Sequence, residues 1–385
     1  MGWRSSAMES RIHAIELVDA GVPVTESARL SGVTRQCLHK WLRRREAEGI
    51  EGLKDRSRAP KKHPNAVTAV MRKRALRYKK KHPDEGPRKI HGYLRGKYPG
   101  QKVPAASTIG LILKEEGLCV ERPTRRREPV TTSNQLTDGV EPNQVWCLDY
   151  KGEFAVGGEL CYPFTVTDHF SRFAIVVRGH RGATVKDSVR ALWRAFDTFG
   201  LPRVIRCDNG TPFASTKSPA GLTRLAVMLE RLGIRRERID PGKPSQNGRH
   251  ERFHRSLKGA TANPPAHSWQ AQQKRFERYC KHYNETRPHE ALNMNVPASV
   301  YQTSDRARPQ NLPVIEHPKA QRVIPVYSSG EIGLKGKKLF LTSTLAGETI
   351  AVDEIEDDLF RCTYGSLYLG VYSLREERPV FHQAP

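Results

Sequence analysis

The sequence has little of what marks secreted or membrane proteins. Its seven cysteines are an odd number with no C-x-x-C pair, which argues against a disulfide framework and against a structural zinc knuckle. No apolar run approaches the roughly 20 residues that a membrane span needs. The start of the chain, MGWRSSAMES, lacks the apolar core of a signal peptide. We therefore expect a soluble intracellular protein with reduced thiols.

Acidic residues are the other scarce class. The chain has 41 Asp and Glu against 65 Lys and Arg, which gives a formal net charge of +24. Such an excess predicts a polyanionic partner, and nucleic acid is the obvious candidate. With 385 residues, the chain is long enough for several domains that each bury a core.

Residues 1–55 predict a helix-turn-helix DNA-binding domain. Three short helices are expected over residues 8–48, and Thr34 is expected to cap the third. Leu38 and Trp41 of that helix face inward. An ordinary helical hairpin with a charged face is the alternative. The outward arc of the third helix carries the side chains that we expect to contact DNA: Arg35, Gln36, His39, Lys40 and Arg43.

A second helical, DNA-binding unit is expected over residues 60–120. Residues 61–81 contain nine Lys or Arg and no acid, with Val70 among the apolar positions. Like charges at that density repel each other unless an anion lies nearby. The pattern favours a second helix-turn-helix, although a basic helical spacer explains the same letters. Residues 121–142 have no apolar pattern and are expected to form an extended linker.

The composition changes at Asn143, where β-branched and aromatic residues become frequent. Three antiparallel strands are expected there, followed by an amphipathic helix and a fourth strand that the helix joins in parallel. This order predicts an α/β catalytic core with a ribonuclease-H-like mixed sheet over residues 143–262. The expected strands are 145–154, 162–167, 172–177, 203–207 and 234–239, and the expected helices are 185–199, 222–232 and 245–259.

The remainder of the chain divides into two further parts. Residues 263–305 are expected to form a helical extension. After it, short apolar runs alternate with glycine-containing turns. That rhythm predicts a small all-β, barrel-like domain over residues 306–385.

The stretch 243–258, KPSQNGRHERFHRSLK, sets one acid, Glu251, among seven cationic or imidazole side chains. A helix that begins near Ser245 places Glu251 on one face with His254 and its basic neighbours, and we expect that face to point outward. Three interpretations are open. His250 to His254 match the H-E-x-x-H pattern of zinc metalloproteases. Glu251 is otherwise the last of three carboxylates that hold divalent metal, or part of a solvated basic face.

Two further acids favour the carboxylate interpretation. Asp149 lies in the first predicted strand and Asp208 ends the fourth. The first and fourth strands are neighbours in a sheet of this order, so the two acids should meet, with Glu251 supplied from the side. Asp at a strand end is alternatively a common turn former.

Clustered carboxylates need a cation to neutralise them, and hard oxygen donors select Mg²⁺ or Mn²⁺. Asp149, Asp208 and Glu251 are therefore the predicted metal-binding and catalytic residues, with two ions for phosphodiester chemistry. Arg255 and Lys258, with Asn247, are expected to contact DNA.

Several motifs resemble the bacterial insertion-sequence transposases of the retroviral-integrase superfamily, known as DDE transposases. They are the W-x-x-D-Y strand around Asp149, Asp208-Asn209-Gly210, the string PSQNGRHERFH, and YN-x-x-RPH-x-x-L from Tyr283 onward. The resemblance extends over residues 10 to 300, and by motif position the three acids are metal ligands.

The resemblance implies a metal-dependent polynucleotidyl transferase and endonuclease. Such an enzyme binds the terminal inverted repeats of a mobile element, cleaves its ends and transfers the 3′-hydroxyl into target DNA. We then expect a homo-oligomer on double-stranded DNA, located in the bacterial cytoplasm with the nucleoid and without a membrane partner.

A DNA-binding regulator with an inactive integrase-like core is the main alternative. A zinc metalloprotease is remote, because arginines surround the two histidines and Leu257 stands where the metzincin pattern needs glycine.

Overall fold

The computed structural model describes residues 8–57, 66–119, 136–208, 210–215, 218–240, 244–317, 322–375 and 380–383. The chain divides into two compact units, Met1–Ala66 and Val67–Pro385. Most of the predicted linker 121–142, together with Asn209, lies outside the described residues. The finer division into six parts stays a prediction.

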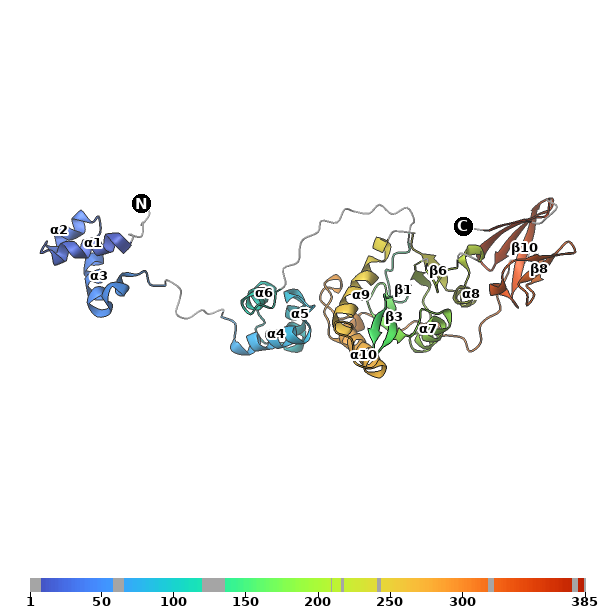
Figure 1. The fold of residues 1–385 in the computed structure, drawn as a ribbon, viewed down its shortest axis with the longest axis horizontal. Helices are drawn as coiled ribbons and strands as arrows, with labels where there is room; N and C mark the ends of the chain where they lie inside the picture. Colours follow the sequence, from blue (N-terminus) through green and yellow to red (C-terminus); the bar gives the residue numbers. More distant parts are fainter. Residues whose placement is uncertain are drawn as a thin grey trace. The chain divides into compact units, whose positions relative to one another are not determined.

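The first unit is a three-helix domain, as predicted. Its elements are α1 (Met8–Asp19), α2 (Val24–Leu30), α3 (Arg35–Glu48) and the 3₁₀ turn η1 (Gly49–Leu53) (Figure 1). The Thr34 hydroxyl accepts a hydrogen bond from the Cys37 backbone N–H at 3.3 Å and so caps α3. Leu38 and Trp41 are buried beside Ile15, and the predicted DNA-facing side chains lie on the exposed or half-exposed arc of α3.

The second unit begins with another helical triplet: α4 (Ala69–Lys81), α5 (Pro87–Lys97) and α6 (Ala106–Glu115). Ala75 and Tyr78 of α4 pack against α5 and α6. Val70, one of the apolar positions of this segment, is 57% exposed, because Met71, Ala75 and Tyr78 occupy the i, i+4 and i+7 positions of the inward stripe.

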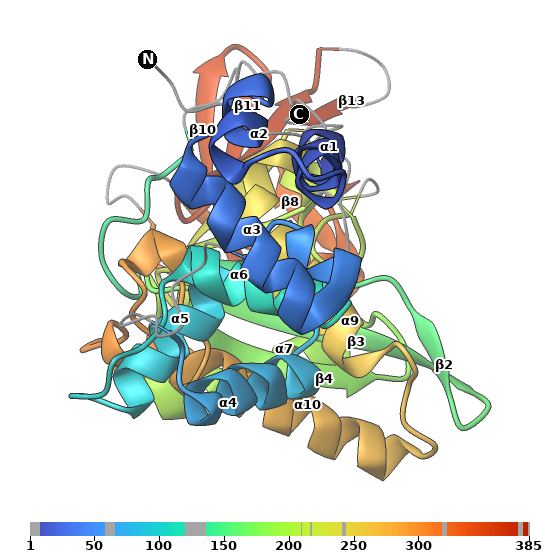
Figure 2. The same ribbon diagram turned by 90° about the vertical axis from the view of Figure 1, so that its left-hand side faces the viewer.

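The central sheet has the predicted ribonuclease-H-like order, β4-β3-β1-β5-β6. β1, β3 and β4 are antiparallel neighbours, and β5 and β6 run parallel to β1. The predicted strand 145–154 is two strands, since β1 ends at Tyr150. The β2–β3 hairpin projects from the sheet (Figure 2). The strands are β1 (Val145–Tyr150), β2 (Phe154–Val156), β3 (Glu159–Asp168), β4 (Ala174–His180), β5 (Val204–Cys207) and β6 (Arg235–Arg238).

Helices cover both faces of this sheet. α7 (Val185–Phe199) and α8 (Arg224–Arg231) pack on the face that presents Trp146 and Leu148. α9 (Gly248–Thr261) and α10 (Trp269–Glu285) pack together beside β2, β3 and β4. α9 begins later than predicted, because the 3₁₀ turn η3 (Pro244–Asn247) precedes it. The short turns η2 (Pro219–Gly221), η4 (Glu290–Leu292), η5 (Pro297–Ser299) and η6 (Ser343–Leu345) complete the helical elements.

The C-terminal domain is all-β, as predicted, but barrel closure is not confirmed. Its described strands form an antiparallel sheet, β13-β12-β11-β10-β7, and a separate β8-β9 hairpin. Leu222 and Ala226, from the turn before α8 and from α8 itself, belong to the core of this domain. No helix in the described ranges is both long and apolar enough to cross a bilayer. The strands are β7 (Arg322–Pro325), β8 (Glu331–Leu334), β9 (Lys337–Phe340), β10 (Thr349–Glu356), β11 (Leu359–Tyr364), β12 (Leu367–Ser373) and β13 (Val380–Gln383).

Candidate active site

Asp149 and Asp208 lie next to each other at the end of two neighbouring parallel strands. The parallel register of β1 and β5 pairs Trp146 with Ile205 and Cys147 with Arg206. Continued by two residues, it sets Asp149 beside Asp208, which directly follows β5. Side chains alternate across a strand, so both acids lie on the face opposite Trp146 and Ile205. Sequence order alone therefore placed this pair correctly.

Glu251 is half-buried in the first turn of α9, close enough for its charge to act on Asp149. The pKa of Asp149 rises to about 7, first because the carboxyl is buried and then because of the negative charge of Asp208, with a smaller contribution from Glu251. Burial also raises the pKa of Asp208, against a backbone hydrogen bond from Gly210. The three acids thus form one electrostatic cluster with excess negative charge.

The histidines of α9 point into the protein, which contradicts the outward face predicted for His254 and the zinc-protease interpretation. His250 and His254 are 1% and 5% exposed. The Nε2 atoms of both rings lie 2.8 and 2.7 Å from the Thr165 hydroxyl, and His250 Nδ1 lies 2.8 Å from the Thr167 hydroxyl. Thr165 stands opposite Asp149 in the sheet. The two rings therefore fasten α9 to β3.

The tautomers of these rings follow from the proton count. The Thr165 hydroxyl donates its single proton to the Asp149 carbonyl at 3.0 Å. Both histidine Nε2 atoms must then donate to the lone pairs of the Thr165 oxygen, while His250 Nδ1 accepts from Thr167. Burial lowers the pKa of His250 to about 3 and that of His254 to about 2, so both rings are neutral.

The three acids fit hard divalent cations by their chemistry. They supply only carboxylate oxygens, and the negative charges of Asp208 and Glu251 add to burial in raising the pKa of Asp149. Their oxygens do not converge on one point: among the described residues, the group of three ligand side chains within 4.8 Å of one another is His82, Glu85 and His282 instead.

Comparison with known proteins identifies the family. Two family models, both described as integrase core domain, match residues 139–244 and 232–297. Models of a helix-turn-helix domain and a homeodomain-like domain match residues 10–61 and 37–113. The chain is 26% identical over 282 residues to the insertion element IS476 uncharacterized 39.2 kDa protein of Xanthomonas euvesicatoria, which covers 72% of this chain and 78% of the relative. Together these matches support an insertion-sequence transposase of the retroviral-integrase superfamily.

Two further matches to this chain are more partial. It is 29% identical over 188 residues to the insertion element IS407 uncharacterized 31.7 kDa protein of Burkholderia multivorans, which covers 49% of this chain and 65% of the relative. The solved catalytic core domain of HTLV-2 integrase in complex with magnesium is 16% identical, with a TM-score of 0.33, and the match covers 43% of this chain and 100% of that one.

The predicted DNA-contacting residues near the acids fall into two groups. Arg255 and Lys258 are exposed on α9. Asn247, by contrast, is only 6% exposed, and its amide oxygen has no hydrogen-bond partner among the described residues. A side chain buried in the turn before α9 is not positioned to meet a DNA backbone, so this part of the prediction is not supported.

The motif that begins at Tyr283 joins three parts of the transposase. Asn284 bonds both the N–H and the C=O of Ala174 in β4, at 2.8 and 3.0 Å. Arg287 pairs with Asp84, which follows α4, at 2.8 Å, and Asp84 also accepts from Ser256 of α9 at 3.0 Å. Sequence reasoning matched these letters to the family but missed their role. The structure explains the role: Arg287 is buried, and a buried arginine needs a carboxylate partner.

Proposed function

We propose that this transposase cleaves the ends of a mobile element and joins the freed 3′-hydroxyl to target DNA, with Asp149, Asp208 and Glu251 as ligands of two Mg²⁺ or Mn²⁺ ions. When bound, such ions activate the attacking oxygen and stabilise the leaving oxygen of a phosphodiester. The observation that carries the proposal is the cluster of three carboxylates, in which burial, then the charge of Asp208 and, less strongly, that of Glu251 raise the pKa of Asp149 to about 7.

The chain's own residues then have distinct tasks. The three acids hold the metal pair, and the neutral rings of His250 and His254 position α9 and the Asp149 strand through Thr165. Arg255 and Lys258 are exposed on the helix of Glu251 and bind substrate phosphates there. No protein nucleophile is required.

We further propose that the first helix-turn-helix selects the terminal inverted repeats. The exposed arc of α3 presents Arg35, Gln36 and Lys40 near its N-terminal end, where recognition helices of this motif meet base edges. The two ends of an element carry related repeats, so we propose that the active species is a homo-oligomer that holds both.

The test uses labelled element-end duplex with Mg²⁺ or Mn²⁺ and reads 3′-end nicking and joining. Asp149→Asn, Asp208→Asn and Glu251→Gln should each reduce both products by more than about 100-fold, since even outer partners of metal sites are worth about 10- to 100-fold. DNA binding should survive, because each change removes negative charge. Double variants should be scarcely worse than single ones.

Glu153→Gln is the matched control, because Glu153 is an exposed acid just after β1. Asp168 is unsuitable: it is 1% exposed and accepts hydrogen bonds from Asn143 and Ser171, so its loss would disturb folding. Near wild-type joining by Glu251→Gln protein would refute the assignment. Sequence-selective binding without any nicking by the wild type would favour the inactive regulator.

A further inference from the structure

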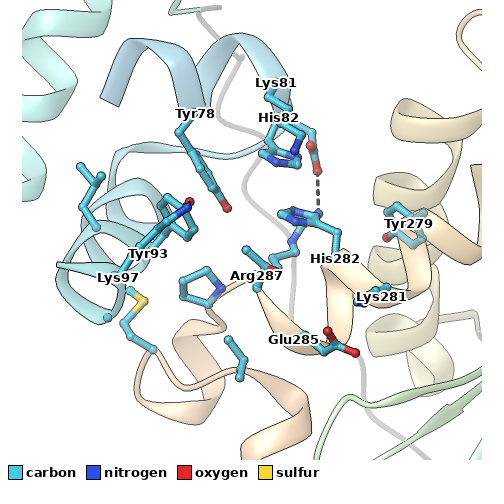
Figure 3. Close-up of a pocket in the computed structure, with 18 of the residues that line it drawn as sticks. Tyr78, Lys81, His82, Tyr93, Lys97, Tyr279, Lys281, His282, Glu285 and Arg287 are labelled. Carbon is cyan, nitrogen blue, oxygen red and sulfur yellow. Dashed lines mark hydrogen bonds and ion pairs between the residues drawn. The ribbon is translucent and has the colours of Figure 1, made fainter. Parts of the chain in front are cut away.

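A basic groove of about 1130 Å³ lies between the second helical triplet and α10 (Figure 3). Helices α4 and α5 form one wall, and α10 with the segment after it forms the other. Eight Lys or Arg side chains line it against two acids, Asp84 and Glu285. The groove therefore carries a large local excess of positive charge.

The exposed cations stand in rows on both walls. Arg77 and Lys81 lie one turn apart on α4, and Arg278 and Lys281 lie one turn apart on α10. Figure 3 shows Lys81 and Lys281 on opposite sides. Within the described ranges, Arg77, Lys81 and Lys281 form no ion pair with a carboxylate. Like charges one turn apart destabilise a helix unless an anion lies between them, so this arrangement favours an anionic occupant.

Buried contacts fix the two walls relative to each other. Asp84, after α4, bonds Arg287 at 2.8 Å, and the neighbouring Glu85 accepts from His282 Nε2 at 2.8 Å. α5 also approaches closely, because a Cβ on Gly92 would come within 3.1 Å of Pro288. The spacing of the cation rows is therefore set before any ligand binds, which lowers the entropic cost of binding.

The cluster of His82, Glu85 and His282 in this groove is a structural contact between α10 and the end of α4, and we do not interpret it as a metal centre. Its ligand atoms lie within 4.8 Å of one another. However, the two imidazole rings are stacked in parallel at 3.7 Å, so their nitrogen lone pairs do not converge. Glu85 already accepts from His282 and from the Tyr78 hydroxyl. A divalent ion here would also add to the surplus of positive charge.

We propose that the groove binds the phosphate backbone of duplex DNA and so holds substrate across the second helical triplet and the catalytic core. The cations extend along two helices, a spread that suits a row of phosphates rather than one small anion. Ser256 of helix α9, which carries Glu251, donates a hydrogen bond to Asp84, the residue that also pairs with Arg287. DNA in the groove therefore lies against elements that contact the helix of the active site. This inference rests on the proposed DNA substrate.

The test compares two triple variants of the full chain. Arg77→Ala/Lys81→Ala/Lys281→Ala empties the groove of three unpaired cations. Lys186→Ala/Arg194→Ala/Arg224→Ala removes three exposed cations of α7 and α8 and is the matched control. Binding to a labelled random-sequence duplex is measured over a salt series in EDTA.

The groove variant should lose about 2.7 in the slope of log K against log salt, and affinity on the order of 100-fold at physiological salt, for three lost phosphate contacts. The control should lose neither. Equal slopes for the two variants would overturn the proposal. EDTA removes divalent metal ions, so this experiment measures DNA binding without cleavage or joining. Equal slopes would therefore contradict only the groove, whereas the catalytic assignment fails only if a variant of one of the three acids still joins DNA.

A second measurement uses the wild-type protein, so it does not depend on the folding of a variant. Lysine acetylation is mapped with and without the same duplex. The proposal predicts that DNA protects Lys81 and Lys281 more strongly than Lys186. Equal modification of Lys81 and Lys281 in the free and DNA-bound protein contradicts it.

Discussion

At the scale of single residues, the acids were predictable and their surroundings were not. Asp149 and Asp208 follow from strand order, because parallel neighbours bring their ends to one edge of the sheet. The orientation of His254 does not follow, since α9 carries polar residues on every side and helical spacing alone does not say which face is buried. Thr165 and Thr167, two polar residues inside a buried strand, select the histidine face by hydrogen bonding.

Arg287 gives a prediction at this scale. Arg287→Ala leaves Asp84, whose side chain is 27% exposed, without its cation and should lower the free energy of unfolding by about 3 kcal/mol. Arg88→Ala is the control, because its pair with Glu290 is exposed on both sides and should be worth less than about 1 kcal/mol. Urea unfolding measures both. Equal losses of unfolding free energy for the two variants would show that the pair of Arg287 and Asp84 does not stabilise the contact between the second helical triplet and the catalytic core.

At the scale of elements, composition located the helices and strands, and local contacts set their ends. The three N-terminal helices match the prediction because Thr34 and the apolar stripe both mark α3. The predicted strand 145–154 breaks after Tyr150, and β2 pairs with the far end of β3 instead. Strands β8 and β13 were missed, because runs as short as four residues carry little periodicity.

The first unit gives a prediction at the scale of elements. Residues Met1–Ala66 form a separate compact unit, so deletion of residues 1–55 should leave the rest folded. The truncated protein should no longer discriminate element-end duplex from random duplex, while weak, salt-sensitive binding remains. Competition binding measures the ratio of the two affinities. Arg35→Ala/Lys40→Ala/Arg43→Ala in the full chain should reproduce the loss of discrimination between the two duplexes. If both proteins still discriminate as well as the wild type, α3 is not the helix that recognises the element end.

At the scale of the whole molecule, the second unit depends on histidines that must stay neutral. Burial lowers the pKa of six of them to values from about 2 to about 4. The six are His82, His169, His180, His250, His254 and His289. The unfolded chain takes up these protons near pH 6.5, well above the folded protein.

This difference predicts acid lability. Between pH 6.5 and about pH 4, these six histidines bind protons in the unfolded chain but not in the folded protein. Asp149, whose pKa burial raises to about 7, acts in the opposite direction, but it is one group against six, so the free energy of unfolding should fall as the pH is lowered through that window. Glu85 adds to the loss at the acid end, because its pKa lies below the ordinary value through its bond with His282 and the charge of Arg287, which outweigh burial. Calorimetry at a series of pH values tests this, and a transition that is flat from pH 6.5 to pH 4 would contradict it.

The most direct test of the central claim locates the metal. Fe²⁺ replaces Mg²⁺ at carboxylate sites and, with ascorbate and peroxide, cuts the backbone close to where it is bound. We predict cuts near Asp149, Asp208 and Glu251 that excess Mg²⁺ suppresses and that Asp149→Asn weakens. Cuts confined to other segments, such as those of His82 and His282, or an unchanged pattern in the Asp149→Asn protein, would contradict the assignment of the three acids as the metal site.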